Sequence, residues 1–202
     1  DRSPSRGLGD VYKRQIYTRR ELTDIYTVCR GFDIPLFIDG ARLAYGLAAS
    51  QDLDIRDIAR LCDIFYIGGT KCGALFGEAV VTKDASRLKG FLTHAKCHGA
   101  LLAKGKLLGV QFDALFTDGL YFRIGAEAVR LAMKLKEKFI TRGFPLFIDS
   151  PTNQQFFVLP NDEIDRLREH VSFELWGVRG DHETPVRFVT SWSTNDADID
   201  SI

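Results

Sequence analysis

The first third of the chain alternates amphipathic stretches with short apolar runs. Thr18 and Glu21 have the spacing of a capping box, and apolar residues then recur at helical period until Gly31. In order, the pattern predicts a helix at about 18–30, a strand at 35–38, short helices opening near Ala41 and at about 54–60, and strands at 63–67 and 79–82. Because helices and strands alternate, we expect a mainly parallel sheet with helices on its faces.

Beyond residue 84 the pattern becomes helical and then changes to short aromatic strands. Helices are predicted at about 84–96, 105–117 and 119–141, strands at 155–159, 173–176 and 187–192, and further helices at about 161–170 and 195–202. Trp176 and Trp192 are expected to lie in the core. The fold class is therefore α/β, with part of a larger domain at 16–118, then a linking helix and a small α+β domain at 119–202.

Residues 1–15 differ in character from the rest, because they are basic, contain Gly and Ser, and show no hydrophobic period. The run 9–15 is similar to translated sequencing-adapter read-through. We therefore interpret residues 1–15 as a non-native or disordered tail and leave them out of the fold. On this interpretation the natural chain continues upstream of Ile16.

The balance of charges and the spacing of the cysteines limit which kinds of molecule the chain is expected to bind. Lys and Arg total 27, as do Asp and Glu, so no binding to nucleic acid or membrane is expected and the partner is a small molecule. The cysteines at 29, 62, 72 and 97 lack the spacing of a zinc site, which favours free thiols in a reducing cytoplasm. His94 and His98 stand four apart but lack a third ligand, so no metal is predicted.

Two charged residues follow neighbouring predicted strands. Asp39 ends the strand at 35–38, and Lys71 follows the strand at 63–67 after two glycines and a threonine. Open α/β sheets bind ligands at the carboxyl ends of their strands. A partly desolvated amine on such a tight connection would have a lowered pKa suited to imine formation. Taken singly, a surface-loop lysine and an Asp-Gly turn are the simpler interpretations.

Arg42 makes the group more specific, because it lies three residues after Asp39 and projects to the same side. A carboxylate can keep a pyridine nitrogen protonated, and a guanidinium can hold a substrate carboxylate at two points. A lysine and an acid in this arrangement are typical of a pyridoxal 5'-phosphate enzyme, in which the lysine forms the Schiff base.

Four separated segments resemble the low-specificity threonine aldolases of the β-eliminating lyase family. They are 37–43, 65–79, 101–105 and 187–192, in the family's order. The resemblance spans residues 16–202. It implies the C-terminal part of the large, cofactor-binding domain of a pyridoxal phosphate-dependent transferase, of the aspartate aminotransferase-like fold, followed by the small domain. It further implies a cytoplasmic homodimer or homotetramer.

The resemblance also implies roles for individual residues. Lys71 corresponds to the lysine that binds pyridoxal phosphate, and Asp39 to the acid at its pyridine nitrogen. Arg42 and Arg187 correspond to the two arginines that bind the substrate carboxylate. Lys104 falls where relatives carry an arginine that reaches the cofactor phosphate of a neighbouring subunit.

Other expectations rest on the same resemblance. Thr70 is expected either to bind the phosphate or to cap its own loop. The implied reaction is cleavage of threonine or allo-threonine to glycine and an aldehyde. A phosphate loop and a stacking histidine are expected upstream of Ile16, so the 202-residue chain itself is expected to be inactive. Two alternatives stay open: another pyridoxal phosphate reaction, such as β-elimination or transamination, and a non-catalytic binding module.

Overall fold

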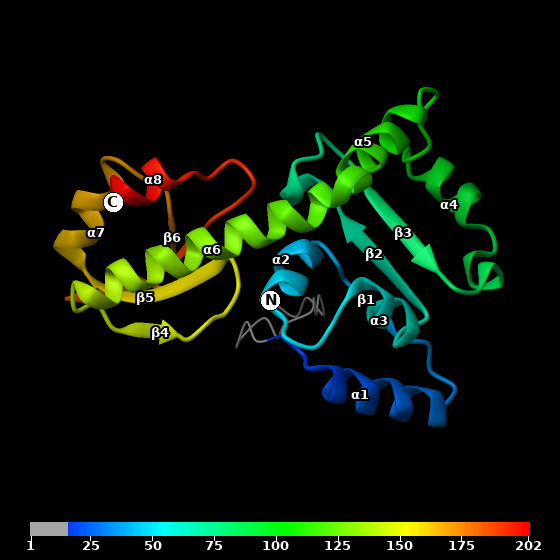
Figure 1. The fold of residues 1–202 in the computed structure, drawn as a ribbon, viewed down its shortest axis with the longest axis horizontal. Helices are drawn as coiled ribbons and strands as arrows, with labels where there is room; N and C mark the ends of the chain where they lie inside the picture. Colours follow the sequence, from blue (N-terminus) through cyan, green and yellow to red (C-terminus); the bar gives the residue numbers. More distant parts are fainter. Residues whose placement is uncertain (1–15) are drawn as a thin grey trace.

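The computed structural model describes residues 16–202, and the interpretation of residues 1–15 lies outside this range. Two sheets stand at opposite ends of one long helix, α6 (Leu120–Thr141) (Figure 1). The α/β fold class is confirmed in this form: a small mixed sheet in the first part of the chain and an antiparallel sheet in the second. No helix within residues 16–202 is both long and apolar enough to span a membrane.

The first sheet has the order β1-β2-β3, with β1 (Phe37–Ile38) parallel to β2 (Ile64–Gly68) and β3 (Glu78–Thr82) antiparallel to β2. The prediction of a mainly parallel sheet is therefore wrong for β3. The reason is the connection at 69–77, which is shorter than the dozen or so residues that a parallel crossover needs. The parallel register pairs Ile38 with Phe65, so both strands end at the same edge.

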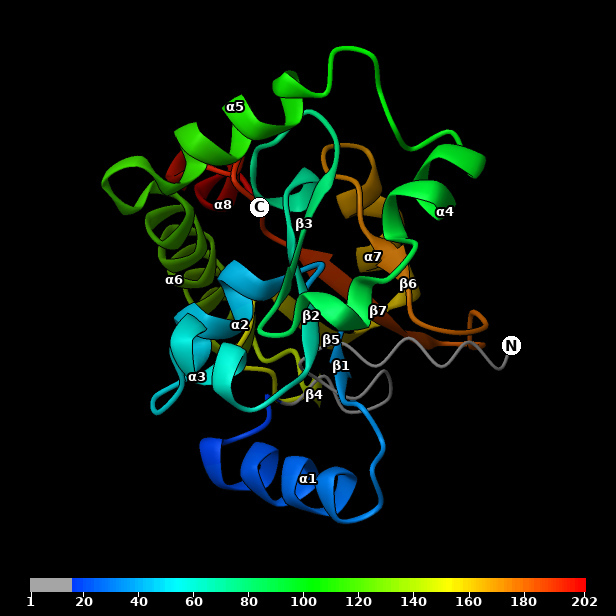
Figure 2. The same ribbon diagram turned by 90° about the vertical axis from the view of Figure 1, so that its right-hand side faces the viewer.

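The helices of this part surround the first sheet. They are α1 (Arg19–Gly31), α2 (Leu43–Ala49), α3 (Ile55–Arg60), α4 (Phe91–Cys97) and α5 (Lys106–Phe116), with the 3-10 turns η1 (Thr70–Cys72), η2 (Ala85–Leu88) and η3 (Thr117–Gly119). The capping box of Thr18 and Glu21 is present. Figures 1 and 2 place α1 and α5 at opposite ends of this part. The predicted helix 84–96 is instead η2 followed by α4, because Gly90 has a left-handed φ of 76° between them.

The second sheet has the order β4-β5-β7-β6, and all of its pairings are antiparallel. Its strands are β4 (Leu146–Ile148), β5 (Gln154–Pro160), β6 (Glu174–Leu175) and β7 (Glu183–Val189), accompanied by α7 (Asn161–Arg168) and α8 (Asp196–Asp200). β4 was not predicted. The strand predicted at 187–192 instead covers 183–189, because Pro185 and its polar neighbours gave its first half the pattern of a loop.

Helix α6 contributes to two separate hydrophobic cores. Tyr121 and Ala128 belong to the core of the first sheet, whereas Leu131, Leu135 and Phe139 belong to that of the second. The amphipathic pattern along α6 thus serves both cores in turn. One continuous helix therefore fixes how the two sheets stand relative to each other.

The two tryptophans differ in burial. Trp192 follows β7 and is 56% exposed, so the prediction that it lies in the core is wrong. The residue comes after the strand has ended, where the alternation of the sheet no longer directs it inward. Trp176 is half-buried and packs edge-on against Phe156, with ring centroids 5.1 Å apart.

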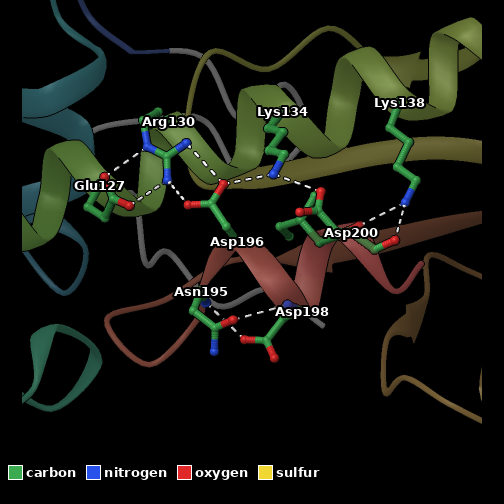
Figure 3. A network of polar contacts seen from close by, with 9 residues as sticks. Glu127, Arg130, Lys134, Lys138, Asn195, Asp196, Asp198 and Asp200 are labelled. Carbon is green, nitrogen blue, oxygen red and sulfur yellow. Dashed lines mark hydrogen bonds and ion pairs between the residues drawn. The ribbon is translucent and has the colours of Figure 1, made fainter.

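The C-terminal helix α8 is fastened to α6 by ion pairs (Figure 3). Arg130 contacts Asp196 at 2.5 Å, and Lys134 contacts Asp196 at 2.8 Å and Asp200 at 2.7 Å. Lys138 donates to the last backbone carbonyls of α8, at 3.0 and 2.8 Å. The cations of α6 thus satisfy both the side chains and the C-terminal end of α8.

Candidate active site

Lys71 lies in η1, the single 3-10 turn that follows β2. The turn is closed by bonds from the N–H groups of Cys72 and Ala74 to the carbonyl of Gly69, at 2.9 and 3.0 Å. Gly73 follows with a φ of 101°, which favours glycine. The backbone is therefore tightly turned where the lysine projects.

The Lys71 ammonium has no hydrogen bond or ion pair with any other residue in the range 16–202. Partial burial lowers its pKa, and the nearby positive charge of Arg42 lowers it further. The direction of this shift agrees with the expectation from the sequence. An amine that loses its proton more readily and has no partner within residues 16–202 is better able to attack a carbonyl carbon.

Asp39 follows β1 directly, and β1 pairs with β2, the strand that precedes the turn of Lys71. Its Oδ1 accepts hydrogen bonds from the N–H of Ala41 at 3.0 Å and from the hydroxyl of Tyr66. Burial raises the pKa of Tyr66, and the hydrogen bond to Asp39 raises it further, so the phenol stays a donor. Within the described residues Oδ2 has no hydrogen-bond partner. One oxygen of the carboxylate is thus held by the protein while the other is available to a ligand.

The ends of β1 and β2 approach so closely that two glycines are required. A Cβ atom on Gly40 would overlap the carbonyl oxygen of Tyr66, and one on Gly68 would lie 2.6 Å from the carbonyl carbon of Ala41. The N–H of Gly68 donates to the carbonyl of Gly40 at 2.9 Å. This contact fixes Asp39 relative to the turn that carries Lys71.

Arg42 stands at the N-cap of α2 and is half-buried. No partner for its guanidinium is found in residues 16–202. Burial lowers its pKa, the positive charge of Arg187 lowers it further, and Glu174 and Asp39 oppose the shift. Arg42 is therefore close enough to interact electrostatically with residues of both sheets.

Arg187 comes from β7 of the second sheet. Its Nη1 donates to Oε1 of Gln154 at 3.1 Å and its Nη2 to Glu174, while the guanidinium lies over the ring of Trp176 at 5.0 Å. The Nε atom is buried without a partner in the described part of the chain. The guanidinium is thus firmly oriented and keeps one unused donor.

The structure brings four of the predicted residues together and leaves two at the margin. Lys71, Asp39, Arg42 and Arg187 are linked by the mutual electrostatic effects described above. The Thr70 hydroxyl is exposed and lies 3.4 Å from Oε1 of Glu78. Lys104 is exposed in the turn before α5, with no ion pair to another described residue. The roles predicted for Thr70 and Lys104 stay predictions.

Two buried tyrosines donate hydrogen bonds to the backbone at the turn that carries Lys71. The Tyr121 hydroxyl donates to the carbonyl of Gly68 at 3.1 Å and accepts from the N–H of Ala44 at 3.2 Å. The Tyr45 hydroxyl donates to the carbonyl of Lys71. Helices α6 and α2 therefore both support the turn that carries the lysine.

Sequence reasoning did not find Tyr66 or Glu174. The predicted strand at 63–67 offered a signal for Tyr66. When the two strands pair in parallel with Ile38 opposite Phe65, the next residues, Asp39 and Tyr66, lie side by side. No comparable signal exists for Glu174, because β6 has only two residues and its partner strand lies later in the chain. Glu174 becomes recognisable only once the pairing with Arg187 is known.

Comparison with known proteins identifies the family. Residues 14–156 match the family model "Beta-eliminating lyase", and the chain belongs to this family. It is 26% identical over 187 residues to a low specificity L-threonine aldolase of Pseudomonas sp. strain NCIMB 10558, and 27% identical over 183 residues to one of Pseudomonas aeruginosa. These alignments cover 91% and 89% of this chain but 53% and 52% of the relatives. The chain thus spans about half the length of the curated relatives it matches.

Solved structures agree with this family. A threonine aldolase of Leishmania major is 39% identical, with a TM-score of 0.87, and the match covers 91% of this chain and 54% of that one. A putative L-allo-threonine aldolase of Listeria monocytogenes is 18% identical, with a TM-score of 0.73. The match covers 93% of this chain and 55% of the Listeria chain. The second likeness is one of fold alone. The homologous threonine aldolases are lyases.

Proposed function

We propose that this chain forms part of a pyridoxal 5'-phosphate-dependent aldehyde-lyase. Its substrates would be threonine, allo-threonine or related β-hydroxy-α-amino acids, and its products glycine and an aldehyde. The observation that carries the proposal is the placement of Asp39 and Lys71 at the adjoining ends of β1 and β2, with Arg42 at the start of α2 and the charge of Arg187 acting on it. The family is pyridoxal phosphate-dependent, and its threonine aldolase members are the relatives described above.

The donor set fits the cofactor. Lys71 offers an amine with a lowered pKa and no partner in residues 16–202, which suits covalent attachment. Asp39 offers an oxygen that no described residue uses, while Tyr66 and Ala41 hold the other one. Lys71 and Asp39 would therefore hold the cofactor at its aldehyde and its ring nitrogen. When bound, pyridoxal phosphate supplies an electron sink for the cleavage of a bond at Cα.

The two arginines would bind and orient the substrate. Arg187 has a buried Nε donor without a partner, and the guanidinium of Arg42 has no partner in the described part of the chain. A carboxylate shared by these groups would be fixed at more than one point, which sets the orientation of the bonds at Cα. The free oxygen of Asp39 would accept the ring N–H, and the Lys71 amine would accept or return a proton.

Product analysis tests the proposal against its two alternatives. Because the chain spans about half the length of its curated relatives, the assay is made on the longest natural protein that contains it and, separately, on the 202 residues. Acetaldehyde and glycine from threonine support the aldolase. Pyruvate and ammonia from serine would instead indicate β-elimination, and formation of a keto acid from threonine with transfer of its amino group would indicate transamination. Turnover is expected only from the longer protein.

The lysine provides a second test of the cofactor itself. Protein-bound Schiff bases of this cofactor absorb at about 420 nm, and Lys71→Ala is expected to abolish this absorbance band. Two results together would favour the alternative of a non-catalytic binding module. They are that Lys71→Ala leaves the function of the protein intact, and that the unaltered protein shows no such band. The absorbance does not depend on the identity of the substrate.

We also propose a homo-oligomer in which the region of Lys104 meets a neighbouring subunit. Large apolar side chains are exposed on both sides of this residue, with Leu92 at 67%, Leu101 at 52% and Val110 at 64%. Large apolar side chains that stay exposed in this number are common at interaction sites. Light scattering after size exclusion would measure the state, and a monomer at micromolar concentration would contradict the proposal.

A further inference from the structure

Glu174 lies beside Arg187, one of the two arginines that are proposed to bind the substrate. It pairs with Arg187 in the antiparallel register of β6 and β7, and its carboxylate forms an ion pair with the Arg187 guanidinium. Its negative charge also acts on Arg42, as noted above. A carboxylate of the protein therefore already pairs with the guanidinium of Arg187, and its charge also acts on Arg42.

The orientation of Arg187 does not depend on this ion pair alone. Gln154 accepts a hydrogen bond from Nη1, and Trp176 lies against the guanidinium. The Arg187 side chain is 12% exposed, whereas that of Glu174 is 64% exposed. Of the two partners, Arg187 is thus held by its surroundings, and Glu174 is the one that can turn out into water.

We propose that the Glu174 carboxylate occupies the carboxylate position of Arg187 until the α-carboxylate of the substrate displaces it. This inference rests on the proposed function, because it takes Arg187 and Arg42 as the substrate arginines. Two neighbouring cations repel each other, and one carboxylate near both relieves the repulsion. Exchange of one carboxylate for another preserves that balance, whereas an empty site would leave two partly buried charges uncompensated. Glu174 would therefore set the affinity for the substrate.

The expected size of the effect follows from the exposure of Glu174. Exposed ion pairs are weak, so removing the competing charge is expected to tighten carboxylate binding by up to about fivefold. Glu174→Gln keeps the shape of the side chain and removes its charge. In the enzyme with bound cofactor, the KM for threonine is expected to fall by this factor, with a smaller change in kcat. Glu137→Gln, at an exposed position of α6, is the matched control and is expected to leave KM unchanged.

A second measurement uses no turnover. Propionate is titrated into the cofactor-free protein, and the Nε–H signal of Arg187 is followed by NMR. Glu174→Gln is expected to lower the dissociation constant by up to about fivefold relative to the unaltered protein. Glu174→Ala serves as a second variant if Glu174→Gln proves unfolded by circular dichroism.

The outcomes separate this inference from the proposed function. A higher KM and weaker propionate binding in Glu174→Gln would mean that Glu174 only positions Arg187, and would overturn the inference. Unchanged values in both assays would overturn it as well. If Arg187→Gln and Arg42→Gln both left KM and propionate binding unchanged, the proposed carboxylate site itself would be wrong. Tighter binding in both Glu174 variants, together with loss of binding in Arg187→Gln, is the supporting result.

Discussion

The cations of α6 and those at the ends of β1 and β2 are satisfied in opposite ways. Arg130, Lys134 and Lys138 on α6 all contact acidic side chains or carbonyls of α8 (Figure 3). Lys71 and Arg42, in contrast, have no ion pair or hydrogen bond to their charged groups within residues 16–202, although Arg42 is half-buried. An unpaired, partly buried charge is costly, so the half-buried guanidinium of Arg42 is suited to bind an anion. Pairing thus separates the cations of α6, which hold α8 in place, from Lys71 and Arg42, with which no residue within 16–202 pairs.

The largest effect is expected at Lys71. Lys71→Ala should reduce threonine cleavage by at least about 10²- to 10⁴-fold, the scale of losing a positioned acid or base, because covalent attachment is lost as well. Lys89→Ala, at an exposed lysine, is the control and should leave the rate unchanged. The measurement is kcat/KM of the enzyme with bound cofactor. A Lys71→Ala variant with more than a tenth of the original rate would break the distinction drawn above.

The contact of the two strand ends should make Gly40 the most sensitive position for stability. Gly40→Ala inserts a Cβ into the backbone of Tyr66, so we expect a loss of about 3 kcal/mol or more, the upper range of overpacked sites. Gly31→Ala is the matched control, because no atom lies within 4 Å of its added Cβ, and it should change stability by less than about 1 kcal/mol. Denaturant unfolding measures both, and equal losses would contradict the close approach.

The pKa of Lys71 should respond to Arg42. Burial and the positive charge of Arg42 both lower this pKa, so the amine becomes neutral at a lower pH than an ordinary lysine. Arg42→Gln removes one of the two causes and should shift the midpoint of Schiff-base formation with pyridoxal phosphate to higher pH. The midpoint is read from absorbance across a pH series. A shift to lower pH in the variant would mean that Arg42 acts on Lys71 by another route.

The smallest effect is expected in the ion pairs of α8. Hydrogen bonds from Arg130 and Lys134 lower the pKa of Asp196 to about 2. Because the folded-state pKa lies below that of the unfolded chain, this contribution is present above about pH 4 and is lost as the pH falls toward 2. Asp196→Asn should slightly lower stability at pH 7 and flatten its decline with acid. The stability difference between Asp196→Asn and the unaltered chain is measured from denaturant midpoints at pH 7, 4 and 3, in low and in high salt. A larger difference in high salt would contradict an origin in ion pairs.

The sequence allowed most of the first half of the site to be predicted. Asp39 and Lys71 each follow a strand with a clear apolar run, and such strands end where the run ends, so their meeting at one sheet edge followed from local pattern. The helices α1, α3 and α6 were recognisable for the same reason, through capping boxes or a long amphipathic period. These features depend on residues close together in the chain.

The features that escaped prediction depend on pairing between distant segments. The direction of β3 follows from the length of a turn, and the limits of β7 from its place between β5 and β6. The bond of Tyr66 to Asp39 requires the strand register, and the ion pair of Glu174 with Arg187 requires a two-residue strand to find its partner. Hydrophobic period carries little information about register when a strand is this short.

The continuity of α6 limits how the two parts of the site can move relative to each other. Lys71, Asp39 and Arg42 move with the first sheet, Arg187 and Glu174 move with the second, and α6 is packed into the cores of both. If one sheet slid against the other, one of these cores would lose its packing against α6. Any relative motion of the two sheets is therefore expected to be a rotation about α6, or a slight bend of α6 between Ala128 and Leu131. A glycine at this point of α6 is expected to loosen the connection between the two arginines without touching either of them.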